Sequence, residues 1–225
     1  MMAQMEASTM DSKSKGLYKV GGASLMLNGV LLIAIFGTVL AGPQPPTDPA
    51  QYLKTFATSS LNLLETALLF ALAILLVPGI LGLYGTLKQA NKTWMLLATG
   101  FFFLGIGALF VATTAAVTSV FLSQSYSSAS NATLQAYYIA GAAATIALGN
   151  SAGFIAGSII SLGILLIGMT MLKSVFGKPL AYLSVVTGLV GSVGSATFYL
   201  PLVIPYFLLY VVWLLWTGFK LWKMG

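Results

Sequence analysis

The sequence predicts an all-α protein, a polytopic bundle of six transmembrane helices with both termini in the cytoplasm. Three observations predict this fold class: 58% of the 225 residues are hydrophobic, only 6% are charged, and long apolar runs alternate with short polar turns. A soluble domain carries about 25% charged residues, so this chain lacks the polar residues needed to cover itself in water. A helix needs about 20 mostly apolar residues to cross a bilayer, and the runs below have that length.

Five apolar runs are long enough without further interpretation. They lie at about 17–42, 60–87, 94–122, 180–200 and 202–221. Residues 1–16 are predicted to form a polar cytoplasmic tail, and residues 17–225 a single transmembrane domain. The first run could instead be a cleavable signal peptide, because Val39-Leu40-Ala41 resembles a small-residue cleavage site. Since the run exceeds the usual signal core of about 7–15 residues, we interpret it as a retained span.

An apolar run between Leu134 and Leu172 decides the number of spans. One straight helix of this length would measure about 58 Å, far more than a bilayer needs. We predict a break at Gly149-Asn150-Ser151, where residue types that weaken or cap helices come together. The fourth span is then about 151–172, and 135–148 is a short interfacial or re-entrant segment. An extension of span four through 135–148 is the alternative.

The distribution of lysine favours six spans over seven. With six spans, nine of the ten lysines fall on one side of the membrane and only Lys54 on the other, whereas seven spans divide them evenly. The positive-inside rule places the lysine-rich side, and with it both termini, in the cytoplasm. The net charge of +6 is therefore a matter of sidedness. We expect membrane lipids as partners and no nucleic acid.

The residue inventory excludes most known catalytic centres. With no His and no Cys, the chain has no imidazole or thiolate for a metal ion, a haem or an iron–sulfur cluster, and no Ser-His-Asp triad. All ten basic residues are Lys, so the planar guanidinium of Arg is missing as well. Among the four acids, only Glu65 falls in an apolar span. We expect no catalytic residues, no cofactor and no metal site.

Glu65 is the main candidate for a functional residue. Thr58, Asn62 and Glu65 follow one another at the spacing i, i+4, i+7, which places them on one face of a helix. The functional hypothesis is a proton- or cation-responsive carboxyl group at the mouth of an outward-facing cavity. The alternative is an interfacial carboxyl group that hydrogen-bonds a neighbouring helix. Asn28 in the first span and Asn150 at the predicted break are further candidates, although amides more commonly bridge helices.

Small residues recur at four-residue spacing in two of the predicted spans. Such faces let helix backbones approach closely in lipid. We expect them to pack helices within the chain, and a homo-oligomer or a membrane-protein partner is the alternative. The two faces are formed by Gly153, Gly157 and Ser161 and by Ser184, Gly188 and Ser192.

The segment 123–133 is uncharged and rich in hydroxyl groups. It contains Asn131-Ala132-Thr133, a sequon that makes Asn131 a candidate glycosylation site on the predicted exterior. Together with 135–148, this segment could form a lid over the outer membrane surface. A solvated loop followed by an interfacial helix is the simpler alternative.

Two stretches of the sequence resemble a known family. The first, GLYKVGG at 16–22, leads into span one, and the closer match is GILLIGMTMLKSVFGKPLAYL at 163–183. These stretches are similar to an uncharacterised prokaryotic family of multi-pass membrane proteins, a domain of unknown function. The resemblance covers most of the chain and implies about six spans in a prokaryotic cytoplasmic membrane, with a basic turn before span five. It implies no substrate and no site residue.

Three classes of function remain open. The leading interpretation is an integral membrane protein without enzymatic activity that acts through lipid or protein partners. The second is a carrier or channel for a small apolar, neutral or protonated solute that uses Glu65, and the third is a membrane enzyme with an unrecognised mechanism. A solvent-connected cavity that reaches Glu65 would favour transport, whereas a tightly packed interior would argue against it.

Overall fold

The computed structural model describes residues 2–41, 45–197 and 200–225, with side chains over 15–39, 45–197 and 201–225. These ranges are helical and contain no strand, as predicted. Six helices are long and apolar enough to span a membrane, and they confirm the predicted six-span fold. In chain order the elements are α1 Met2–Ala41, α2 Pro49–Gln51, the π-helix η1 Tyr52–Phe56, α3 Ser60–Leu87, α4 Lys92–Ser127, α5 Ala132–Met171, α6 Lys178–Ala196 and α7 Leu200–Lys223.

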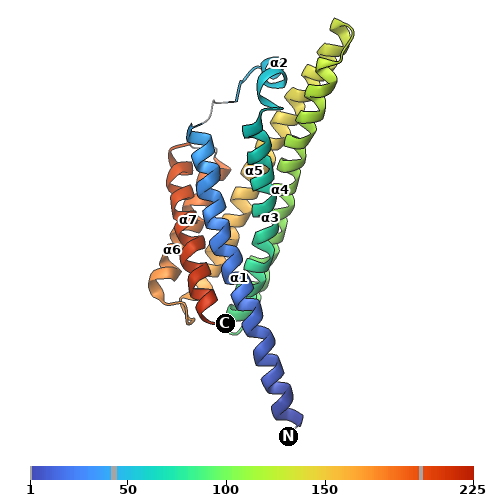
Figure 1. Cartoon of the computed structure of the whole chain (residues 1–225). Helices are drawn as coiled ribbons and strands as arrows, with labels where there is room; N and C mark the ends of the chain where they lie inside the picture. The colour runs from blue at the N-terminus through green and yellow to red at the C-terminus, as the bar shows by residue number, and fades with distance from the viewer. Residues whose placement is uncertain (1, 42–44, 198–199) are drawn as a thin grey trace.

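The six long helices form a closed ring in which each helix packs against two neighbours. The order around the ring is α1, α3, α4, α5, α6, α7 and back to α1. Both chain termini and the turns at 88–91 and 172–177 lie at one end of the ring (Figure 1). Since every described lysine except Lys54 belongs to a segment at this end, we call it the lysine-rich end. The opposite end, which carries α2, η1 and the α4–α5 turn, is the hairpin end.

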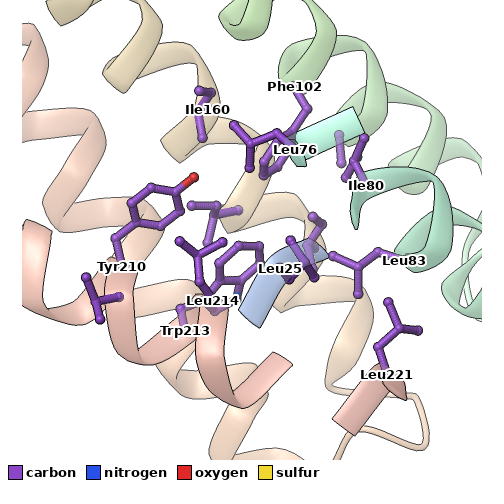
Figure 2. Close-up of a cluster of buried hydrophobic side chains, with 14 of the residues drawn as sticks. Leu25, Leu76, Ile80, Leu83, Phe102, Ile160, Tyr210, Trp213, Leu214 and Leu221 are labelled. Carbon is purple, nitrogen blue, oxygen red and sulfur yellow. The ribbon is translucent and has the colours of Figure 1, made fainter. Parts of the chain in front are cut away.

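Apolar side chains fill the interior of the ring. Leu25, Leu76, Phe102, Tyr210 and Trp213 converge there from four different helices (Figure 2). Tyr210 stacks on Trp213 with their ring centroids 6.0 Å apart, and Trp213 stacks on Phe102 at 6.4 Å. Because lipid is as apolar as these side chains, their stabilising effect comes from close packing with one another. The middle of the ring is therefore packed rather than hollow.

Glycines bring the helix backbones into direct contact. A Cβ atom at Gly22 of α1 would lie 2.5 Å from the backbone nitrogen of Trp222 in α7, and one at Gly188 of α6 would lie 2.6 Å from that of Leu165 in α5. Both predicted small-residue faces contribute to the α5–α6 contact, where Gly157 meets Ser195. Gly157, Ser161, Ser184 and Gly188 of these faces thus pack within the chain, as expected, whereas a Cβ atom at Gly153 would meet nothing within 4 Å. Partner binding through them stays a prediction.

The predicted break at 149–151 is wrong, because α5 is a single helix of 40 residues. Gly149 lies against α4, where a Cβ atom would come 3.3 Å from the Cβ of Ala115. Glycine weakens a helix by about 1 kcal/mol, which packing along the long α4–α5 contact outweighs. The cap of α5 is Asn131, whose Oδ1 accepts a hydrogen bond from the Leu134 nitrogen at 2.9 Å. Residues 135–148 therefore continue the helix of span four without a break, and their position relative to the membrane stays a prediction.

The α4–α5 pair projects beyond the other helices at the hairpin end (Figure 1). Helices of 36 and 40 residues are about 54 and 60 Å long, against about 30 Å of hydrocarbon. Residues 123–133 form the end of α4, a short turn and the start of α5 at the tip of this hairpin, and whether they cover the membrane surface as a lid stays a prediction. At the other end α1 already begins at Met2, so the predicted polar tail is helical and extends away from the ring (Figure 1).

Candidate functional site

The candidate site lies beneath a short helical segment at the hairpin end, residues 49–57, which we call the outer cap. The cap begins with Asp48, whose carboxylate accepts hydrogen bonds from the backbone nitrogens of Ala50 and Gln51, and Pro49 occupies the first helical position. Its second half is η1, in which the Ala57 nitrogen donates to the Tyr52 carbonyl at 2.9 Å. Such π-helical turns are rare and frequently occur at functional sites.

Apolar contacts hold the outer cap against the inner side of the α4–α5 hairpin. Leu53 is completely buried and packs with Tyr126 of α4 and Ala142 of α5. The remaining buried side chains of the cap form a second cluster with α5, made of Tyr52, Phe56, Ala57 and Ile146. The cap therefore covers apolar surface on the projecting hairpin.

Two side chains from neighbouring helices satisfy the carbonyl groups of the cap. The Ser123 hydroxyl of α4 donates to the Leu53 carbonyl at 2.6 Å, and the Asn62 amide of α3 donates to the Ala57 carbonyl at 2.9 Å. Buried carbonyl groups need such partners because leaving them without a donor is costly. Ser123 and Asn62 thus attach the π-helical turn to α4 and α3.

Glu65 lies half-buried near Tyr52. Burial raises the pKa of the Tyr52 phenol above its usual value. A hydrogen bond with the Ser119 side chain acts in the opposite direction, and the neighbouring Glu65 carboxylate adds to the increase, so the pKa is raised overall. The phenol is therefore neutral around pH 7. Within the described ranges, no residue donates a hydrogen bond to Glu65 or forms an ion pair with it. The site consists of one unpaired carboxyl group, a phenol and a hydroxyl group.

The structure brings two of the predicted residues together under the cap, Glu65 and Asn62. Thr58 does not share their helical face, because Ser59 caps α3 and the helix begins only at Ser60. Thr58 is exposed in the preceding turn, so this part of the prediction is wrong.

The other predicted polar residues lie elsewhere. Asn28 is fully buried in the ring and donates to the Leu72 carbonyl at 3.1 Å, which links α1 to α3. Asn150 is exposed on α5, and Asn131 is exposed at its N-cap, where glycosylation stays a prediction. No three acidic side chains among the described residues come close enough to hold a metal ion.

Sequence reasoning missed Tyr52, Ser119 and Ser123. The two serines are four residues apart in an apolar helix, so they lie on one helical face. That spacing was a usable signal for a polar contact between α4 and another segment. Their partner, the outer cap, is too short and too irregular for its position to follow from periodicity.

Two cavities border α4 near the hairpin end. The larger, of about 480 Å³, lies between α3 and α4, and residues such as Ala67, Phe70, Phe110 and Phe121 line it. We call it the α3–α4 groove. A second cavity of about 300 Å³ lies between α4 and α5. Glu65 lines neither of them.

One comparison with known proteins identifies the chain. The family described as a domain of unknown function (DUF4386) matches residues 22–220, which include all of the ring except the beginning of α1 and the end of α7. No curated protein and no solved structure matches the chain. Six candidate spans together with a family match over most of the sequence show that this is a multi-pass membrane protein that belongs to the DUF4386 family.

Proposed function

We propose that this protein is non-enzymatic and acts through a bound membrane lipid, one acyl chain of which occupies the α3–α4 groove. The proposal places it in a prokaryotic cytoplasmic membrane with the lysine-rich end in the cytoplasm, as the positive-inside rule favours. The observation that carries the proposal is the chemistry of the groove, which lies within two candidate spans and has no charged residue in its lining.

The hydroxyl protons of the groove are already engaged in hydrogen bonds. Its three hydroxyl groups belong to Thr66, Thr113 and Thr114, and each donates to a backbone carbonyl of its own helix. The lining therefore offers a ligand no free hydroxyl proton and no charged group. The groove therefore favours an apolar occupant.

The shape of the groove suits an acyl chain. Its volume falls within the range of about 300–1,000 Å³ that is typical of small-molecule sites. The rings of Phe70 and Phe110 meet edge to face with centroids 5.6 Å apart, at the end of the groove nearest the middle of the spans. Membrane hydrocarbon surrounds the groove and supplies an occupant of the required chemistry.

A carrier or channel is the second candidate and has less support. The interior of the ring is filled by side chains such as Leu76, Phe102 and Trp213, and neither cavity reaches Glu65. A membrane enzyme with an unrecognised mechanism is the third candidate.

Groove-filling substitutions test the proposal. Ala67→Phe puts a ring into the α3–α4 groove, whereas Leu104→Phe adds a ring on the exposed face of α4 outside it. Native mass spectrometry after mild solubilisation measures the lipid that stays bound. We expect one lipid to remain on the wild type and on Leu104→Phe and to be lost from Ala67→Phe. Equal retention by all three proteins would exclude the groove as the lipid site.

A further inference from the structure

We propose that the bound lipid has two acyl chains, of which the second occupies the cavity between α4 and α5, so that the lipid straddles α4. We call this space the α4–α5 cavity; its volume is about 300 Å³. The inference rests on the proposed function, because it names the class of lipid that the α3–α4 groove receives. The observation that carries it is the position of two apolar spaces on either side of one face of α4.

The groove and the cavity adjoin each other along α4. Phe110 and Thr114 line both of them. Other α4 residues line only one space, such as Thr113 and Val120 in the groove and Thr118 in the cavity. Because successive residues of a helix advance by about 100°, the two spaces lie roughly a quarter turn apart around α4. On a helix about 10–12 Å wide this separation is about 8 Å, which two neighbouring ester groups on one glycerol backbone can bridge.

The α4–α5 cavity has the same chemistry as the groove. None of its lining residues is charged, and its hydroxyl groups belong to Thr114, Thr118 and Thr145. Each of these hydroxyl groups donates to a backbone carbonyl of its own helix at 2.7 or 2.8 Å. The apolar side chains of Val111 and Leu148, which also line the cavity, are exposed. Such a lining favours hydrocarbon, because a polar ligand would lose its hydrogen bonds to water there.

Both spaces match the depth of one membrane leaflet and extend in the same direction. On α4 the groove reaches from Phe110 to Phe121, about 16 Å at 1.5 Å per residue, and the cavity from Phe110 to Thr118, about 12 Å. Half of the hydrocarbon thickness is about 15 Å. Since α4 runs toward the hairpin end, both spaces extend from the shared Phe110 toward that end (Figure 1). The two chains of one lipid whose headgroup lies at the hairpin end therefore fit side by side.

The surface of α4 just beyond the two spaces is polar but uncharged. Gln124 and Ser128 are exposed there, and the described parts of α4 and α5 have no charged residue at the hairpin end. Lys54 of the outer cap lies over the ring of Tyr126, whose position on α4 is about 160° from that of Phe110. The lipid headgroup therefore meets no charged partner on α4 or α5, and we expect the acyl chains to determine the affinity.

A single lipid with two chains is favoured over two separate one-chain molecules. Once the first chain lies in the groove, the second is tethered beside the cavity, so its binding becomes an intramolecular step. Linkage of this kind raises affinity by up to about 10²–10⁴ without any new kind of contact. Both chains also gain dispersion attraction along the length of the spaces that they fill.

Titration of the delipidated protein with two lipids that share a headgroup tests the inference. The lipids are dipalmitoyl phosphatidylethanolamine and its one-chain form, palmitoyl lysophosphatidylethanolamine, and native mass spectrometry in detergent measures their apparent Kd values. We expect the wild type to bind the two-chain lipid at least about tenfold more tightly than the one-chain lipid. Thr118→Phe, which puts a ring into the α4–α5 cavity alone, should reduce this preference to less than about threefold. Leu104→Phe, on the exposed face of α4 outside both spaces, should keep the preference of the wild type.

The outcomes separate this inference from the proposed function. A preference for two chains that persists in Thr118→Phe, or that is absent from the wild type, would overturn the inference and leave the groove as a lipid site. Undiminished binding of both lipids by Ala67→Phe would instead overturn the proposed function, and this inference with it. Thr118 is exposed and its hydroxyl group bonds within α4, so its replacement should leave the fold intact. If Thr118→Phe does not fold, Thr145→Phe fills the same cavity from α5 and must meet the same expectation.

Discussion

Replacing Gly188 by alanine should destabilise the protein by forcing α5 and α6 apart. The added Cβ atom would lie 2.6 Å from the Leu165 nitrogen and 2.7 Å from its Cα and Cβ atoms. Carbon atoms pack best at about 3.5–4.0 Å, so the helices must separate locally by about 1 Å. The atoms in the way include backbone atoms of Leu165, which no change of rotamer can move.

The size of the effect follows from two opposing contributions. Overpacking of this kind costs about 1–3 kcal/mol, whereas alanine stabilises a helix relative to glycine by up to about 1 kcal/mol. Gly107→Ala is the matched control, because Gly107 is exposed in the interior of α4 and a Cβ atom there meets nothing within 4 Å. Both variants gain the same helix propensity. The difference between them therefore isolates the packing cost, which we expect to be about 1–3 kcal/mol.

Reversible unfolding in mixed micelles with increasing dodecyl sulfate, followed by circular dichroism, measures this difference. Gly188→Ala should unfold at a lower mole fraction of dodecyl sulfate than the wild type, and Gly107→Ala at the same or a higher one. If the two variants differ by less than about 0.5 kcal/mol, the backbone contact between α5 and α6 is not present in the membrane protein.

Two further predictions use the same unfolding measurement. In the wild type the Trp213 indole donates a hydrogen bond to the Ser184 hydroxyl at 2.8 Å. Trp213→Phe should therefore lower the free energy of unfolding by about 0.6–1.7 kcal/mol. Trp216→Phe, at an exposed position, should unfold with nearly the free energy of the wild type. Equal stability of these two variants would show that the bond does not contribute. Asn150→Ala should be as stable as the wild type or up to about 0.7 kcal/mol more stable, because Asn150 is exposed inside a continuous helix. A loss of about 1 kcal/mol would instead indicate that Asn150 caps a separate helix after a break.

Hydropathy and charge were sufficient to predict the six spans. Span two was predicted at 60–87 and α3 is Ser60–Leu87, because Ser59 caps the helix and Lys88 follows it. The contact between α5 and α6 was also foreseeable, since small residues at four-residue spacing favour close packing in lipid. The break in α5 was predicted wrongly because local propensity was given more weight than packing against α4, which lies far away in the sequence.

The candidate site was predictable only in part. Glu65 was identified because it is the one acid within an apolar run. Its neighbours Tyr52 and Ser119 belong to a π-helical turn and to another span, so no spacing within one helix relates them to Glu65. Thr58 was included because a regular helix was assumed to begin before Ser59, and the chain forms a turn there instead.

The sequence by itself determined that this chain crosses a membrane six times, which lysines share one end of the bundle, and which chemistries lack the necessary side chains. The spans follow from the free energy of transferring each segment into hydrocarbon, the shared end of the lysines follows from their positions between the spans, and the excluded chemistries follow from the residue inventory. Only the tertiary structure decided that the helices close into a packed ring, that α4 and α5 project as one hairpin, and that the outer cap packs against that hairpin. Those features depend on contacts between atoms of distant segments, such as Gly188 with Leu165 and Ser123 with Leu53, whose geometry no local pattern contains.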